Sequence, residues 1–171
     1  PVDRAAVGGR DADTIRHLVE YSTQVGALNP VLQNQISEVI SLEELTVEAI
    51  TTPNAEPVSV GPDAAVADVR AAALASGHLR ILQRDDDGRL PLVIHVRDTL
   101  EANDEQRADA FARPSFRVDA STKVYELLRT MREKHVQLAL VEQGEKLLGV
   151  VTLTDVIRRV LPSTDAASQN N

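Results

Sequence analysis

Two segments of the chain share one arrangement of apolar and polar positions, and each ends on an aspartate. They are Leu92 to Asp98 (LVIHVRD) and Gly149 to Asp155 (GVVTLTD). Each apolar run is too short and too β-branched for a helix, so it predicts a buried strand. The strand end then delivers a small polar group and a carboxylate to the start of a helix. The pattern therefore predicts a ligand-site geometry that occurs twice.

The two segments belong to a longer internal repeat. The offset of 57 residues that separates Asp98 from Asp155 also separates His95 from Thr152. Two copies are too few for a solenoid, which needs three or more units to bury its core. We therefore expect an α/β (α+β) fold in which two halves are related by a pseudo-two-fold axis.

Each copy is expected to fold in the order β-α-β-β-α. The second copy's first helix has the clearest period, with apolar residues at i, i+3, i+4 and i+7, namely Val124, Leu127, Leu128 and Met131. The elements expected in the first copy are strand 57–60, helix 63–76 with Asp63 as its cap, strand 79–84, strand 90–95 and a helix from Arg97. Those expected in the second copy are strand 116–118, helix 121–134, strands 136–142 and 147–151, and helix 154–161.

Two helices are expected ahead of the repeat, outside it. One runs from about Ala12 to Val25, and Asn29-Pro30 opens the next. The expected division is a linker at 1–11, an N-terminal helical segment at 12–50, a first repeat unit at 51–101, a linker at 102–113, a second repeat unit at 114–161 and a disordered tail at 162–171.

Composition narrows the classes of partner. The net charge of −8 argues against phosphate-backbone binding, and two Phe, two Tyr and no Trp argue against stacking platforms, so we expect no nucleic-acid partner. Cysteine is absent, which excludes disulfides and thiolate metal sites. No apolar run reaches the roughly 18 residues of a membrane span, so the chain itself is expected to be soluble.

The repeat resembles a tandem pair of cystathionine β-synthase (CBS) domains, called a Bateman module. Gly149 to Ile157 is similar to the closing motif of that family. More narrowly, the segments 49–53 (AITTP), 76–80 (SGHLR) and 20–28 (EYSTQVGAL) resemble the cytosolic part of the CorC and cyclin M (hemolysin-C-like) magnesium transport proteins. The resemblance covers about residues 12–161.

The resemblance implies a regulatory module that binds an adenine nucleotide, most simply ATP with Mg²⁺ held through the nucleotide, in a cleft between the copies. It also implies control of a membrane-bound magnesium or cobalt transporter, attachment to a transmembrane domain in the full-length protein, a place at the cytoplasmic face of the membrane, and a homodimer formed through the CBS helices. No enzymatic activity and no protein-held metal are implied.

The residues that match the family's nucleotide site are Thr52, Pro53, Asn54, Ala55, Pro57, Val58, Arg80, Thr152, Thr154 and Asp155. The resemblance assigns the ribose hydroxyls to Asp155, whose ionised carboxylate accepts hydrogen bonds. Thr152, Thr154 and the helix N-terminus would hold phosphate oxygens, and Arg80 would neutralise phosphate charge.

A second cleft would use His95, Asp98 and Phe116. Here His95 stands where Thr152 stands in the second copy, and Leu92 replaces Gly149, so the backbone is less open to a ligand. We therefore expect one good nucleotide site. Thr154 and Asn54 also depart from the family, which usually has glutamate and arginine at these positions.

Three other readings are open from the sequence. The pair can be a degenerate module that keeps only its dimer-forming role, and Asp155 can then be an ordinary helix-capping residue. The chain can also be an enzyme that uses His95 with Asp98 or His78. Against this, the spacing of these residues does not bring a base, an orienting group and a nucleophile together. His78 and His135 are expected to be packing or capping residues, because no second ligand sits at metal-binding spacing.

Overall fold

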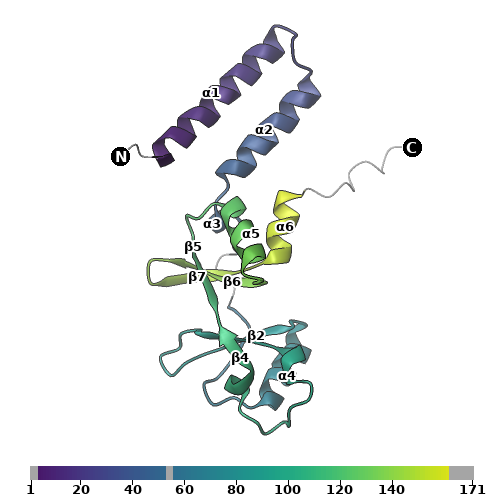
Figure 1. The fold of residues 1–171 in the computed structure, drawn as a ribbon, viewed down its shortest axis with the longest axis vertical. Helices are drawn as coiled ribbons and strands as arrows, with labels where there is room; N and C mark the ends of the chain where they lie inside the picture. Colours follow the sequence, from purple (N-terminus) through teal and green to yellow (C-terminus); the bar gives the residue numbers. More distant parts are fainter. Residues whose placement is uncertain (1–3, 53–55, 162–171) are drawn as a thin grey trace, which may run out of the picture.

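The computed structural model describes residues 4–52 and 56–161, with side chains from residue 12 onward (Figure 1). A pair of helices lies at one end of the molecule, and two α/β halves follow it along the long axis. The half next to the helices is built from the second repeat, and the far half from the first. The expected fold, two related α/β halves preceded by a helical pair, is confirmed.

The helical pair consists of α1 (Arg4–Gln24) and α2 (Pro30–Glu44). Asn29 caps α2 as predicted, because its side chain accepts a hydrogen bond from the Val31 N–H at 2.8 Å. The helix α1 starts earlier than expected, so most of the expected linker 1–11 is helical.

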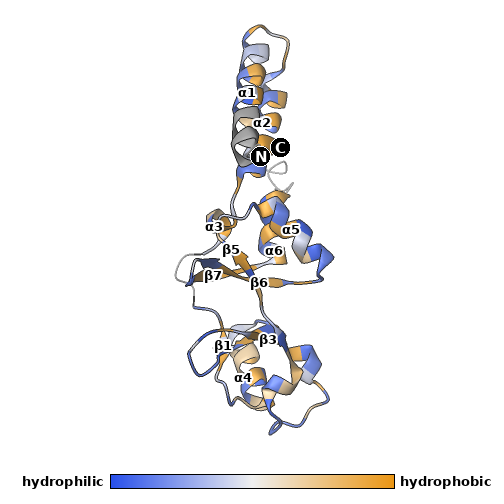
Figure 2. Ribbon diagram, turned by 60° about the vertical axis from the view of Figure 1, so that its left-hand side comes forward, coloured by the Kyte–Doolittle hydropathy of each residue, from blue (hydrophilic) through white to orange (hydrophobic). Residues whose placement is uncertain are grey.

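The pair stands clear of the two halves, as Figure 2 shows. Arg16 joins the two helices through a 2.8 Å ion pair with Glu44, and Lys123 of the second half donates to the Glu44 carbonyl. Many apolar side chains on the pair are exposed, among them Leu18, Tyr21, Val25, Val31 and Val39. Over the described residues, no helix combines the length and apolarity that crossing a membrane requires.

The first half is a four-stranded sheet in the order β1-β2-β3-β4, parallel between β1 and β2 and antiparallel elsewhere. Its elements in chain order are β1 (Ser59–Val60), α4 (Val66–Ser76), β2 (Arg80–Gln83), β3 (Leu92–His95), η1 (Val96–Thr99), η2 (Ala108–Phe111) and β4 (Ala112–Pro114). Its buried core contains Val60, Ala64, Val69, Ile81, Ile94 and Ala108.

Three expectations for this half were wrong. The helix expected from Arg97 is only the short 3₁₀ turn η1, and the Arg70 guanidinium donates to the carbonyls of Thr99 and Ala102 at and after its end. Asp63 does not cap α4. The first free N–H, that of Ala65, is bonded instead by the Asp68 carboxylate at 2.8 Å.

The segment expected to be a linker at 102–113 is also part of the first half. Ala108 is fully buried in the core, and β4 adds a strand to the sheet beside β3. The charged residues of this segment predicted an exposed linker. The Arg107 guanidinium does lie outside, where it pairs with Asp63 and Asp109 at 3.0 and 2.8 Å.

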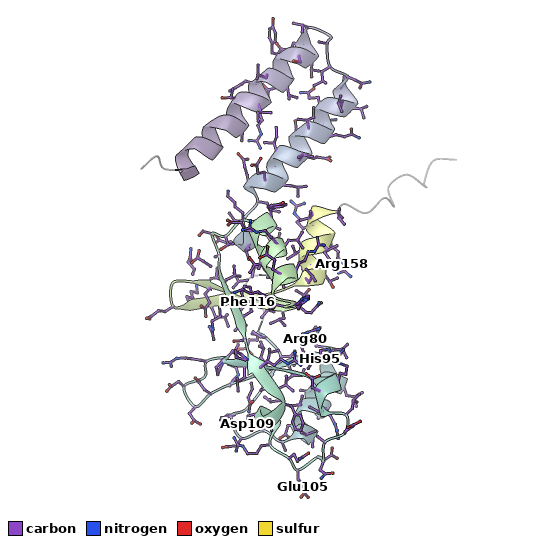
Figure 3. All side chains as sticks on the ribbon, in the orientation of Figure 1. Arg80, His95, Glu105, Asp109, Phe116 and Arg158 are labelled. Atoms are coloured by element: carbon purple, nitrogen blue, oxygen red, sulfur yellow. The ribbon has the colours of Figure 1, made fainter. Side chains whose placement is uncertain are left out.

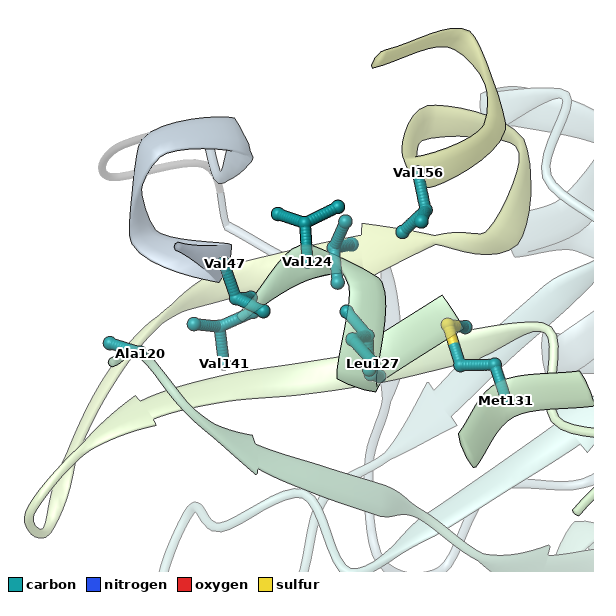
Figure 4. Close-up of a cluster of buried hydrophobic side chains, with 9 residues drawn as sticks. Val47, Ala120, Val124, Leu127, Met131, Val141 and Val156 are labelled. Atoms are coloured by element: carbon teal, nitrogen blue, oxygen red, sulfur yellow. The ribbon is translucent and has the colours of Figure 1, made fainter. Parts of the chain in front are cut away.

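The second half is a three-stranded sheet in the order β5-β6-β7, covered by helices on one face. Its elements are β5 (Phe116–Asp119), α5 (Val124–Glu133), β6 (Leu138–Gln143), β7 (Lys146–Thr152) and α6 (Leu153–Val160). The predicted helical stripe is confirmed, since Val124, Leu127 and Met131 are buried in the core that Figure 4 shows.

A short helix ahead of the first half completes this core. The helix α3 (Val47–Ile50) places Val47, which is fully buried, among the side chains of the second half (Figure 4). The Val47 and Glu48 N–H groups donate to the Thr122 and Ala120 carbonyls. The segment that precedes the first half in the sequence therefore packs on the second half, and this contact connects the two halves.

A third apolar cluster lies between the halves. Leu82 and Leu90 of the first half and Leu140 of the second are buried together, and Val93, Leu138, Leu147 and Val150 pack against them. Arg117 reinforces this junction by donating from the second half to the Leu90 carbonyl at 3.0 Å.

Candidate functional site

Asp155 and Thr152 form a reciprocal cap at the start of α6. The Asp155 N–H donates to the Thr152 hydroxyl at 3.2 Å, while Asp155 Oδ2 accepts from the Thr152 N–H at 3.0 Å and from its hydroxyl at 2.7 Å. This is a capping box, which satisfies donors that the helix start leaves free. The Asp155 Oδ1 atom has no hydrogen-bond partner among the residues that the structure describes, so one carboxylate oxygen remains for a ligand.

The Asp155 side chain lines a cavity of about 310 Å³ between α3, β7 and α6, at the small end of the range for ligand sites. Thr52 lines the same cavity, so the structure brings together two of the predicted site residues. The other lining residues are Ala49, Ile50, Val150, Arg158 and Arg159. The cavity thus combines an apolar wall with one carboxylate and two guanidinium groups.

Sequence reasoning missed Arg158 and Arg159, although the signal was present. They follow Asp155 by three and four residues in the expected helix, and residues at this spacing share a helix face. Figure 3 shows Arg158 on α6, on the second half. They supply at this site the positive charge that was expected from Arg80.

Gly149 allows the segment before the first half to approach β7. A Cβ atom at this position would lie 3.0 Å from both Thr51 Cγ2 and the Thr52 carbonyl oxygen. The space that the glycine leaves is therefore filled by the chain itself, next to the cavity that Thr52 lines.

We expect Gly149→Ala to destabilise the fold by about 1–2 kcal/mol, because Thr51 and the Thr52 backbone must move to admit the methyl group. Gly61→Ala is the matched control. Its Cβ would meet nothing within 4 Å and its φ is not positive, so the loss of unfolded-state entropy should leave it neutral or stabilised by up to about 1 kcal/mol. Urea unfolding of both variants checks this, and equal effects would contradict it.

A second, larger cavity of about 740 Å³ lies between the two hairpin turns. Leu90 and Leu140 form part of its wall, and Pro57 also lines it. Its rim carries basic and acidic side chains of both halves, including Arg84, Arg89, Arg117, Lys146, Asp87, Glu142 and Glu145. The structure therefore places Pro57 in a different cavity from Asp155, while Val58 packs against the first-half core.

The remaining residues predicted for the nucleotide site fall into two groups. Thr154 is exposed on the first turn of α6, and the Thr152 hydroxyl already donates to Asp155. Pro53, Asn54 and Ala55 lie outside the described residues.

Arg80 does not line the Asp155 cavity. It is paired across the first sheet with His95, and these two residues lie together on the first half in Figure 3. Asp98 is close by and forms ion pairs with Arg113 at 3.2 Å and Arg97 at 3.8 Å. The structure thus places Arg80 beside His95 and Asp98, two residues of the second predicted cleft, and its assignment to the Asp155 site stays a prediction.

Phe116 is not part of that group. It packs against the second-half core, and the Lys134 Nζ lies 5.3 Å from the centre of its ring. Figure 3 shows it on the second half, apart from Arg80 and His95.

His95 performs in the first half the capping role that Thr152 performs in the second. Its Nδ1 accepts a hydrogen bond from the Arg97 N–H at 3.0 Å. Burial, followed by the positive charges of Arg80 and Arg97, lowers the pKa of His95 below its usual 6.5. The side chain is therefore neutral at pH 7 and can act as an acceptor.

This lowered pKa predicts a loss of stability in mild acid. The unfolded chain binds a proton at His95 more readily than the folded chain, so the stabilisation is complete above pH 6.5 and is lost as the pH falls through the folded pKa. We expect His95→Asn, whose amide oxygen can accept from Arg97 N–H, to be less sensitive than the parent chain to a change from pH 7.5 to 5.5. Urea unfolding at the two pH values measures the change in free energy of unfolding for each chain. An equal change in the parent chain and in His95→Asn would contradict the prediction.

Within residues 12–52 and 56–161, no group of three His, Asp or Glu side chains is placed to hold a metal ion. The groups around Asp155 suit a small polar ligand. An oxygen acceptor, two guanidinium groups and an apolar wall can together bind a molecule that carries hydroxyl groups and negative charge.

Comparison with known proteins bears on this site. The family model described as "CBS domain" matches residues 108–162. The UPF0053 protein MT1890 of Mycobacterium tuberculosis (strain CDC 1551 / Oshkosh) is 28% identical over 151 residues, which cover 84% of this chain and 33% of that protein. The chain thus spans about a third of the length of this relative.

Solved structures share the fold. The CBS domain of a bacterial CNNM/CorC family Mg²⁺ transporter superposes with a TM-score of 0.70 at 23% identity, covering 88% of this chain and 96% of that one. A structure of such a domain in complex with ATP gives a TM-score of 0.67 at 25% identity, covering 77% and 97%. Residues 108–162 therefore match a CBS domain, and the chain as a whole has the fold seen in CBS domains of bacterial CNNM/CorC family Mg²⁺ transporters.

Proposed function

We propose that this chain is a regulatory module that binds an adenine nucleotide, ATP alone or with Mg²⁺, and thereby controls a membrane-bound magnesium or cobalt transporter. The observation that carries the proposal is the Asp155 carboxylate, which has one oxygen free at a cavity that two arginines also line.

The residues of the cavity suit the parts of a nucleotide. Asp155 Oδ1 can accept a hydrogen bond from a ribose hydroxyl, and charge-assisted bonds of this kind are about twice as strong as neutral ones. Arg158 and Arg159 can bind phosphate oxygens, and the apolar wall, which includes Ile50 and Val150, can contact the base.

The proposal extends to partners of the module. A transmembrane domain elsewhere in the full-length protein, at whose cytoplasmic face the module would lie, fits a chain that spans a third of its relative. A homodimer through the CBS helices would cover apolar side chains exposed on α4, α5 and α6, namely Leu74, Tyr125 and Ile157.

One observation favours a second candidate, a pair that has kept only its dimer-forming role. The capping box occupies Asp155 Oδ2 and the Thr152 hydroxyl, which is a sufficient structural reason for both residues. In this alternative the chain would self-associate and bind no nucleotide.

Thermal unfolding with ATP, ADP and AMP, each with and without Mg²⁺, separates the two. A ligand that binds only the folded state at about 100 times its Kd stabilises by about 2.7 kcal/mol, or roughly 5–10 °C for a chain of this size. We expect such a shift with at least one nucleotide. No shift with any of them, while light scattering still shows a dimer, would favour the second candidate and contradict the sensor.

A further inference from the structure

The larger cavity, of about 740 Å³, is separate from the proposed nucleotide site, because it shares no lining residue with the Asp155 cavity. Its volume lies in the range of pockets that bury most of a small ligand. Its floor is formed by Leu90, Leu140 and Leu147, which belong to the apolar cluster between the halves. Leu90 and Leu140 are buried, so both halves contribute apolar surface to this cavity.

Charged side chains of both signs surround this floor. Two pairs are already formed, each within one half, namely Arg117 with Glu142 and Arg89 with Asp87. Over the described ranges 12–52 and 56–161, no ion pair joins a lining residue of one half to a lining residue of the other. Five charged residues of the lining form no ion pair in these ranges: Arg84, Lys146, Glu48, Glu56 and Glu145.

Arg84 and Glu48 are the anchored members of this group, one on the hairpin between β2 and β3 and one on α3. The Arg84 N–H donates to the Val60 carbonyl at 2.9 Å, and its Nε donates to Ser59 Oγ at 2.9 Å. The Glu48 N–H donates to the Ala120 carbonyl at 2.9 Å. Among the residues that the structure describes, neither Arg84 Nη2 nor the Glu48 carboxylate has a hydrogen-bond partner. The cavity thus presents a free cation and a free anion on fixed backbone.

We propose that this cavity binds a zwitterion with an apolar body, which is the chemistry of a short apolar peptide with free termini. The carboxylate of the peptide pairs with Arg84, its ammonium group pairs with Glu48, and its apolar side chain covers the floor. A ligand with charges of only one sign would meet lining groups of its own sign, which costs free energy. The proposal does not rest on the nucleotide function, because the two cavities share no residue.

Calorimetric titration of the full chain with the tripeptide alanyl-leucyl-alanine, at fixed ionic strength, tests the site. We expect saturable binding of the tripeptide with free termini. The same tripeptide with an acetylated N-terminus and an amidated C-terminus should not bind, because blocking removes both charges and keeps the apolar body. Equal binding of the two forms, or binding of neither, would overturn the proposal.

Variants of the two anchored residues test the contacts. Glu48→Gln and Arg84→Gln should each weaken binding of the free tripeptide by about threefold or more, because each removes a charge-assisted contact. The controls are Glu126→Gln and Arg129→Gln on α5, which line neither cavity and should change the affinity by less than about twofold. Glu126 matches Glu48, since both are exposed in the first turn of their helices.

An equal loss of affinity in a site variant and its control would overturn the proposal, provided far-UV circular dichroism shows both variants folded. Two more titrations keep this cavity apart from the nucleotide site. Asp155→Asn should bind the tripeptide as the parent chain does, and ATP should not displace the tripeptide. Displacement by ATP would assign the cavity to the nucleotide, which would overturn this proposal and leave the nucleotide sensor intact.

Discussion

Replacing Leu140 with alanine is expected to cost the folded chain about 2–5 kcal/mol, the largest single effect on stability that we predict. Leu140 is fully buried and joins Leu82 and Leu90 in the apolar cluster between the halves. The change removes burial and leaves a cavity that packed neighbours on both sides cannot fill. Urea unfolding followed by circular dichroism measures the loss.

The same leucine-to-alanine change at an exposed position is the control for this packing effect. Leu100 is 69% exposed at the end of η1, so Leu100→Ala should change stability by no more than about 0.5 kcal/mol. Because Leu140 holds the halves together, its loss should also make unfolding less cooperative, seen as a lower apparent m-value. A loss below about 1 kcal/mol, or one equal to that of Leu100→Ala, would show that the halves do not depend on this cluster.

The sequence was sufficient for the repeat and most of its elements, because these depend on local patterns. The spacing of Val124, Leu127 and Met131 predicted α5 and its buried face, and both are found. The pairing of His95 with Thr152 by offset also holds in the structure, since both side chains cap the helical turn that follows their strand. Strand alternation and helix periodicity are encoded within a few residues, which is why they can be read directly.

The errors occurred where distant residues decide the outcome. The turn after His95 ends at Thr99, where Arg70, far away in the chain, donates to the Thr99 and Ala102 carbonyls. Ala108 is buried although its neighbours are charged, because the Arg107 guanidinium turns outward to Asp63 and Asp109. No local pattern reports such contacts.

For the same reason, only part of the candidate site could be predicted from the sequence. The closing motif identified Asp155 and Thr152, but the position of Arg80 depends on the sheet register, which places it opposite His95. A one-strand motif cannot reveal which cleft a neighbouring strand faces. The cationic residues at the Asp155 cavity, Arg158 and Arg159, follow instead from helix geometry once α6 is known to begin at Leu153.

Asp155→Asn is expected to weaken ATP binding at least tenfold, on the proposal that this carboxylate holds the ribose. The amide keeps an acceptor for the Thr152 N–H but loses the charge that strengthens a hydrogen bond from a sugar hydroxyl, worth about 1.5–3 kcal/mol. Loss of the negative charge at the start of α6 should also destabilise the fold by about 0.5–1 kcal/mol. Calorimetric titration of ATP with Mg²⁺, on both chains at the same concentration, measures the first effect.

Asp68 provides the control that distinguishes ligand binding from capping. It occupies the same third position of its helix, α4, and its carboxylate accepts from the Ala65 N–H at 2.8 Å, but it lines neither cavity. Asp68→Asn should therefore lower stability by a similar amount and leave ATP affinity unchanged. If both variants lose affinity equally, the effect of Asp155 is one of helix stability alone, and the carboxylate does not contact the nucleotide.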